Sequence, residues 1–296
     1  MMSIETFLTM IFFGFGLILP WVLALGRRWQ ARGEATSHVA MGWRPLVHSM
    51  LAYVLAFNIT FFIQELFLVL PKALVPGLKP TLFHNNHDWA GDAAIAELFQ
   101  GTGGLAILLS GFIFSVIASR QARPSFFILW MAFNGLFQSL PQFVVGAIIP
   151  GNDMGRAYDY LQLGTAGEVA LALLAVAALP VAGVWLGRRF VATAWNSGQV
   201  RSAKSRHAYL LRVAGLATLA GLPLIILFRV PREPMEVLFS PILVPLFGFG
   251  WMQMAAFGMR SASAAGRQPV RLLPMLIAAV ALLAIFQLVL RPGIPF

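Results

Sequence analysis

Long apolar stretches, separated by short polar segments, run through the whole chain. Eight of them are long enough to cross a bilayer, which takes about 20 helical residues each. They lie near residues 6–26, 46–70, 96–119, 125–149, 165–187, 208–229, 237–258 and 272–291. The pattern predicts an all-α, polytopic integral membrane protein whose residues 1–296 form a single transmembrane domain.

The composition agrees with this class. The 296 residues are 59% hydrophobic and 11% charged, whereas soluble domains carry about 25% charged residues. The chain has no cysteine, which excludes disulfides, thiolate zinc sites and cysteine nucleophiles. The net charge of +10 is not accompanied by any nucleic-acid-binding pattern. We therefore expect the lipid bilayer, and no nucleic acid, as a partner.

Basic residues are unevenly divided between the two sets of loops. Most of the 21 lie in the loops that follow the first, third, fifth and seventh stretches. The positive-inside rule places those loops in the cytoplasm. We therefore expect a multi-pass protein of the cell inner membrane with both termini on the outer, periplasmic side. The basic residues that fall on the outer side are Lys72, Lys79, Arg156, Arg229, Arg232 and Arg291.

Polar side chains interrupt the predicted spans between residues 46 and 170. Asn58 and Glu65 are seven positions apart and so share a helical face, and three amides recur at four-residue intervals within 125–149. Such groups usually face a protein interior or a water-filled cavity, because they are costly in hydrocarbon. The residues expected to line a pocket are Asn58, Gln100, Asn134, Gln138, Gln142 and Glu168. Alternatively, the amides serve as hydrogen-bonding glue between helices.

The segment LKPTLFHNNHDWAGD, residues 78–92, is the most polar part of the expected outer surface. On a helical turn His84, His87 and Asp88 would face the same way and could bind zinc, iron or copper. Further candidate ligands are Glu65, Glu97 and Asp153. The alternative is an interfacial loop without a metal, anchored by Trp89.

Glu65, His87 and Asp88 are also the candidate catalytic groups, with His87 as base and Asp88 as its orienting carboxylate. The predicted site is a polar, metal-binding pocket at the outer face of the spans in 46–170. The loops 71–95 and 150–163 would roof it. The stretches within 206–291 carry few polar side chains and are expected to be structural or docking helices.

Two segments resemble the intramembrane zinc proteases of the site-2 protease type, which carry a helical HExxH and a later Asn/Pro segment ending in Asp-Gly. The segments are QELFL at 64–68 and FNGLFQSLPQFVVGAIIPGNDMGR at 133–156. The resemblance implies that Glu65 takes the place of the general base and Asp153 that of the zinc-binding aspartate. Gln64 and Leu68 stand where the zinc-binding histidines belong, so it implies an inactive relative.

Three classes of function remain open. The first is a membrane enzyme or metal-binding protein with its site in the outer leaflet. The second is an accessory or assembly subunit of a larger membrane complex, for which the apolar stretches of 206–291 would suit docking to membrane-protein partners. The third is a small-molecule transporter. Polar residues confined to the outer half count against transport, because a path must reach both sides of the membrane.

Overall fold

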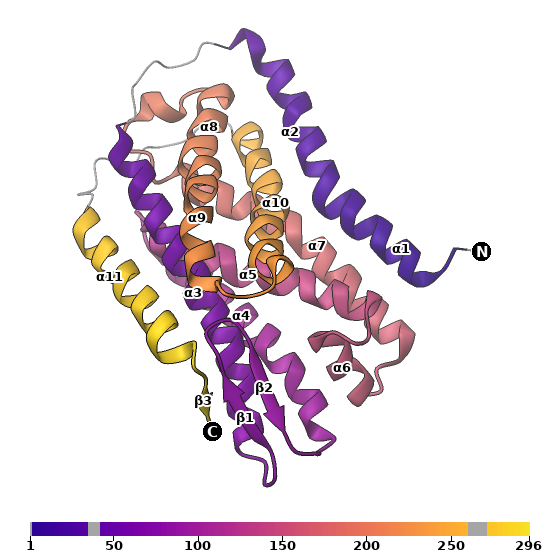
Figure 1. The fold of residues 1–296 in the computed structure, drawn as a ribbon. Helices are drawn as coiled ribbons and strands as arrows, with labels where there is room; N and C mark the ends of the chain where they lie inside the picture. The colour runs from indigo at the N-terminus through magenta and orange to yellow at the C-terminus, as the bar shows by residue number, and fades with distance from the viewer. Residues whose placement is uncertain (1, 35–41, 260–270) are drawn as a thin grey trace.

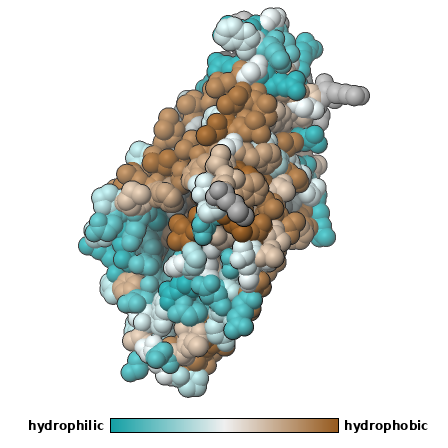
Figure 2. Space-filling model, turned by 90° about the vertical axis from the view of Figure 1, so that its right-hand side faces the viewer, coloured by the Kyte–Doolittle hydropathy of each residue, from teal (hydrophilic) through white to brown (hydrophobic). Residues whose placement is uncertain are grey.

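The computed structural model describes residues 2–34, 42–259 and 271–296, which form a bundle of long helices with a small β-sheet at one end (Figure 1). Within these ranges, eight helical segments are long and apolar enough to cross a membrane, as the sequence predicts. They are Ile4–Gly33, Trp43–Ala73, Ile95–Arg120, Phe126–Ile148, Gly164–Val191, Ala203–Arg229, Pro234–Gly258 and Leu272–Leu290. Figure 2 shows hydrophobic residues over the middle of one face and hydrophilic residues towards its ends. The chain is a multi-pass membrane protein.

Five of the spans are single α-helices. These are α3 (Trp43–Ala73), α4 (Ile95–Arg120), α5 (Phe126–Ile148), α7 (Gly164–Val191) and α10 (Pro234–Gly258). The other three contain a π-helical stretch: α1 (Ile4–Ile11), η1 (Phe12–Ile18) and α2 (Leu19–Gln30); α8 (Ala203–Leu210), η4 (Leu211–Leu216) and α9 (Ala217–Arg229); α11 (Leu272–Ala284) and η5 (Ile285–Leu290). The short helix α6 (Asp153–Tyr160) begins after Asn152, whose side chain accepts a hydrogen bond from the Gly155 amide.

The central helices approach one another closely at glycines. A Cβ at Gly135 of α5 would lie 2.4 Å from the Cα of Gly111 in α4. On α4, a Cβ at Gly103 would lie 2.7 Å from Leu68 and 2.9 Å from the Gln64 carbonyl oxygen of α3. Small residues permit such approaches, and dispersion contacts between the helices stabilise them. This packing brings the C-terminal part of α3 and the N-terminal part of α4 together beneath the sheet.

The segment after α3 forms a small β-hairpin in an otherwise helical fold, in place of the helical turn expected for His84, His87 and Asp88. β1 (Lys79–Leu82) pairs antiparallel with β2 (His87–Ala90), and β3 (Ile294–Pro295) from the C-terminus pairs with the other edge of β1. Leu82 faces His87 in the register, and the Phe83 amide closes the turn on the Asn86 carbonyl at 2.8 Å. Alternating side chains suit a pleated strand that packs one face on helices. The hairpin therefore lies over α3.

Candidate functional site

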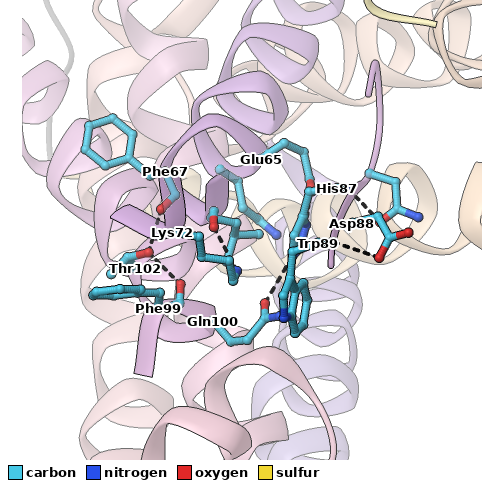
Figure 3. Close-up of polar contacts among 12 residues, drawn as sticks. Glu65, Phe67, Lys72, His87, Asp88, Trp89, Phe99, Gln100 and Thr102 are labelled. Atoms are coloured by element: carbon cyan, nitrogen blue, oxygen red, sulfur yellow. Dashed lines mark hydrogen bonds and ion pairs between the residues drawn. The ribbon is translucent and has the colours of Figure 1, made fainter. Parts of the chain in front are cut away.

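Glu65 and His87 form a buried, hydrogen-bonded pair at the junction of α3 and the hairpin. Glu65 lies about two turns before the end of α3 and is 5% exposed. In β2, His87 and Trp89 face the helices while Asp88 and Ala90 face away, because successive strand residues alternate. His87 Nδ1 lies 2.9 Å from Glu65 Oε2, and His87 Nε2 lies 3.2 Å from Gln100 Oε1 of α4 (Figure 3). The imidazole thus bridges α3 and α4.

The hydrogen bonds of His87 are compatible with more than one protonation state. With the Gln100 oxygen on Nε2, that nitrogen carries a proton, and Nδ1 either donates a second proton to the Glu65 carboxylate or accepts one from a neutral Glu65 carboxyl group. With the Gln100 amide flipped, its N–H₂ group donates to Nε2 and a neutral imidazole donates from Nδ1 to Glu65. A carboxylate that holds one imidazole nitrogen while the other exchanges a proton is the arrangement of an acid–base pair.

The positively charged side chains of Lys72 and Arg156 lie close to the indole ring of Trp89. Its indole is stacked on the His87 ring at 5.9 Å between centroids and 9° between planes. The Lys72 ammonium lies 4.5 Å from the indole centroid, and the Arg156 guanidinium carbon lies 5.1 Å from it. Both distances are within the range of cation–π attraction. Lys72 is fully buried and donates to the Leu68 carbonyl at 2.8 Å.

Two acidic residues complete the cluster. Glu97, in the first turn of α4, accepts two hydrogen bonds from Arg156 of α6. Asp153 begins α6, and burial raises the pKa of its carboxyl group. The charge of His87 opposes this shift, while that of Glu65 adds to it. Asp153 and the Glu65–His87 pair therefore share one electrostatic environment.

A cavity of about 560 Å³ lies beside this cluster, between the first span, α3, α5, α6 and α10. Its apolar wall consists of Phe12, Phe13, Phe61, Phe137, Pro141, Val145, Ile148, Ile149, Met154, Phe239, Leu243, Val244 and Phe247. Its polar lining consists of Thr9, Gln64, Gln138, Gln142, Asn152, Asp153 and Ser240. Phe13 and Phe239 are 39% and 54% exposed, so this part of the wall reaches the lipid-facing surface.

Some polar groups around the cavity have hydrogen-bond partners and one, Gln138 Oε1, has none. Gln142 Nε2 donates to Gln64 Oε1 at 2.9 Å and to the Gln138 carbonyl. Gln138 Nε2 donates to Asn134 Oδ1, but Gln138 Oε1 is buried without a hydrogen-bond partner. A buried acceptor without a donor is costly, so a molecule in the cavity that offers a hydroxyl or N–H group would be favoured there.

The three metal ligands expected in the hairpin do not meet. The expectation required a helical turn, whereas the segment is a hairpin. His84 lies in its turn near Arg229, Arg232 and Arg291, and the exposed Asp88 accepts a hydrogen bond from its neighbour's amide. Across residues 2–34, 42–259 and 271–296, no three His, Asp or Glu side chains lie close enough together to bind one metal ion.

The other expected residues divide between site and scaffold. Gln100 binds His87, and Gln138 and Gln142 line the cavity, but Asn58 and Asn134 are buried and donate to carbonyls of their own helices, those of Val54 and Trp130. Glu168 of α7 is half-buried and acts electrostatically on Tyr158.

Lys72 and Arg156 belong to the site, although the sequence analysis placed them only among the basic residues of the outer loops. The feature of the sequence that could have identified them is their position in outer loops, where the positive-inside rule expects few basic residues. Gln64, which stands where the zinc proteases have a histidine, accepts a hydrogen bond from Gln142, and Leu68 is buried.

The chain matches no family model, no curated protein and no solved structure.

Proposed function

We propose that this protein binds an amphipathic molecule from the bilayer and presents its polar end to the charged cluster of Glu65, His87 and Asp153, of which Asp153 lines the cavity. The observation that carries the proposal is a single cavity whose wall includes exposed Phe13 and Phe239 at one place and Asp153 at another. Ligand sites of about 300–1,000 Å³ typically combine apolar walls with a few polar groups that orient the ligand. This cavity has both the size and the composition.

The residues suggest a role for each part of the site. Aromatic rings such as Phe12 and Phe247, whose centroids lie 4.5 Å apart, would contact an alkyl or isoprenoid chain. Gln138 would accept a hydrogen bond from a hydroxyl or amine of the head. Asp153, which lines the cavity, would then exchange a proton with that head in a general acid–base reaction, and the Glu65–His87 pair would act on Asp153 electrostatically.

Positive charge would support this chemistry. Lys72 and Arg156 flank the indole of Trp89 and act electrostatically on Asp153. They would stabilise negative charge that develops on the head when it loses a proton. Under the expected topology the reaction would take place at the periplasmic side of the inner membrane.

Photo-crosslinking tests the binding step. The probe is a long-chain alcohol with a diazirine on its chain, added to the full-length protein in membranes. Leu243→Trp, on α10, fills part of the cavity and should lower labelling about fivefold or more, because overpacking costs about 1–3 kcal/mol. Leu238→Trp is the matched control, since Leu238 is on the same helix, is exposed and does not line the cavity. Equal labelling of both variants would contradict the proposal.

A polar variant tests the orientation of the molecule. Gln138→Leu removes the unpartnered acceptor but keeps a similar volume. We expect it to abolish any preference for the alcohol probe over the corresponding alkane probe while leaving the labelled cavity residues the same. An unchanged preference would mean that the polar end does not reach Gln138.

A further inference from the structure

A second polar cluster surrounds His84 in the turn of the hairpin. His84 is 2% exposed, and neither ring nitrogen has a hydrogen-bond partner of good geometry. Burial lowers its pKa, and the positive charges of Arg232, Arg291 and Arg229 lower it further, although the backbone of Arg229 favours the protonated form. The three arginines come from the end of α9, the connection to α10 and the residue after η5. Three separate segments thus bring positive charge to one histidine.

Arg229 is the most deeply buried arginine of this cluster. It is 3% exposed, its guanidinium lies 4.2 Å above the Phe61 ring, and it donates through Nε and Nη2 to the Glu236 carbonyl. Its Nη1 has no partner. Asn85 fixes the hairpin turn against the same helix by donating to the Phe228 carbonyl at 2.8 Å.

Glu65 and Glu236 act electrostatically on Arg229, but no carboxylate in the part of the chain that the structure describes lies within 4.0 Å of any of the three arginines. Over the described residues the ion pairs within 4.0 Å are Glu65–His87 and Glu97–Arg156, and neither includes Arg229, Arg232 or Arg291. A buried N–H group without a hydrogen-bond partner is unfavourable, and neither Glu65 nor Glu236 accepts a hydrogen bond from Arg229 Nη1. The cluster therefore has an unused donor from which an anion could accept a hydrogen bond.

We propose that His84, Arg229, Arg232 and Arg291 bind a phosphate-bearing anion. Guanidinium groups match phosphate oxygens in geometry and charge, and Arg229 Nη1 is a free donor for one of them. Arg291 is exposed and Arg232 half-buried, so the cluster is open on one side. It lies at the end of the bundle that carries the hairpin and the C-terminus (Figure 1), a depth at which phospholipid headgroups would meet a spanning protein. The proposal does not depend on the cavity or on the Glu65–His87 pair.

Native mass spectrometry of the detergent-solubilised full-length protein tests the site. A short-chain phosphatidylglycerol is titrated against the protein, with phosphatidylcholine as the zwitterionic comparison and inorganic phosphate as competitor. We expect Arg232→Gln and Arg291→Gln each to weaken phosphatidylglycerol binding about tenfold, since each removes a charge-assisted contact. Lys79→Gln is the matched control, because Lys79 is an exposed basic residue of β1 outside the cluster. It should bind like the unsubstituted protein.

The competitor distinguishes the two sources of phosphate. Displacement of the lipid by millimolar inorganic phosphate, lost in Arg291→Gln, would show a site for the phosphate group alone. Resistance to phosphate, with phosphatidylglycerol still preferred over phosphatidylcholine, would show a lipid headgroup site. Equal binding of the two lipids without competition by phosphate, or unchanged binding in both arginine variants, would overturn the proposal. Because Arg291 is exposed, its variant is expected to fold, and a thermal unfolding curve verifies this.

Discussion

Glu65 Oε2 lies 2.9 Å from His87 Nδ1, although the two residues are 22 positions apart and belong to different kinds of structure. Glu65 comes from the transmembrane helix α3, and His87 comes from a strand of the hairpin that covers it. The contact joins the hairpin to the membrane domain. It also holds two charged groups close enough to act electrostatically on Asp153, the residue of the cluster that lines the cavity of the proposed function.

Breaking this pair should destabilise the protein strongly. Glu65→Gln leaves the imidazole without its carboxylate, and the free energy of unfolding should fall by about 3–5 kcal/mol, as for other buried pairs that lose one partner. A double-mutant cycle with His87→Gln, followed by thermal unfolding in detergent, should give a coupling of about 0.5–3 kcal/mol. Asp88→Asn is the control and should change stability by about 0.5 kcal/mol or less, because Asp88 is exposed. Additive effects of the two substitutions would show that the pair does not interact.

Trp89 should contribute to the stability of the protein through cation–π contacts of its aromatic face as well as through its size. Trp89→Leu removes the aromatic ring near Lys72 and Arg156, so we expect a loss of about 1–3 kcal/mol, with about 0.5–2 kcal/mol for each cation–π contact. Trp89→Phe keeps a weaker aromatic face and should retain part of this stability. Chemical denaturation in detergent measures whether the stability falls in the order unsubstituted protein, Trp89→Phe, Trp89→Leu. Equal losses in the two variants would exclude a cation–π contribution.

The glycine contact between α4 and α5 should not tolerate a methyl group. Gly135→Ala would place its Cβ 2.4 Å from Gly111, against backbone that cannot rotate away, so the helices must separate. We expect a loss of about 1–3 kcal/mol, as for overpacked cores. Gly14→Ala, where nothing lies within 4 Å, is the matched control and should be neutral or slightly stabilising. Thermal unfolding of the two variants compares them directly.

Acid should weaken the fold through His84. Burial and the neighbouring arginines lower the pKa of His84 from its ordinary value of 6.5. Below that value the unfolded chain binds a proton that the folded protein does not, so stability falls as the pH is lowered. Thermal midpoints between about pH 7.5 and about pH 5.5, in low-salt buffer without phosphate, should show a smaller decline for His84→Gln than for the unsubstituted protein. An identical decline would assign the acid sensitivity to other groups.

The orientation of the protein in the membrane can be tested by labelling introduced cysteines, because the chain has no cysteine of its own. Asp88→Cys, in the exposed face of β2, should react with a membrane-impermeant maleimide in intact cells. Lys204→Cys should react only after the inner membrane is permeabilised, since the positive-inside rule places its loop in the cytoplasm. The reverse pattern would invert the topology and move the proposed site to the cytoplasmic side.

Hydropathy determines the membrane class because spanning segments must satisfy their backbone hydrogen bonds internally. The eight apolar stretches predicted from the sequence correspond to the eight helical spans of the described structure, with ends that differ by at most seven residues. Of the amides in this pattern, Gln138 and Gln142 line a cavity in the structure. Asn58 and Asn134, on the same predicted faces, instead bond to their own helices. Periodicity identifies a face but not what packs against it.

The partners of the polar residues were decided by tertiary structure. Adjacency in the sequence suggested Asp88 as the partner of His87, and three-residue spacing suggested His84 as a second ligand. The hairpin separates them, because strand alternation turns Asp88 outward and the turn carries His84 towards Arg229. Glu65 reaches His87 only because the hairpin folds back on α3. Hydrophobicity acts residue by residue and can be predicted from a linear pattern, whereas an ion pair depends on where two distant segments meet.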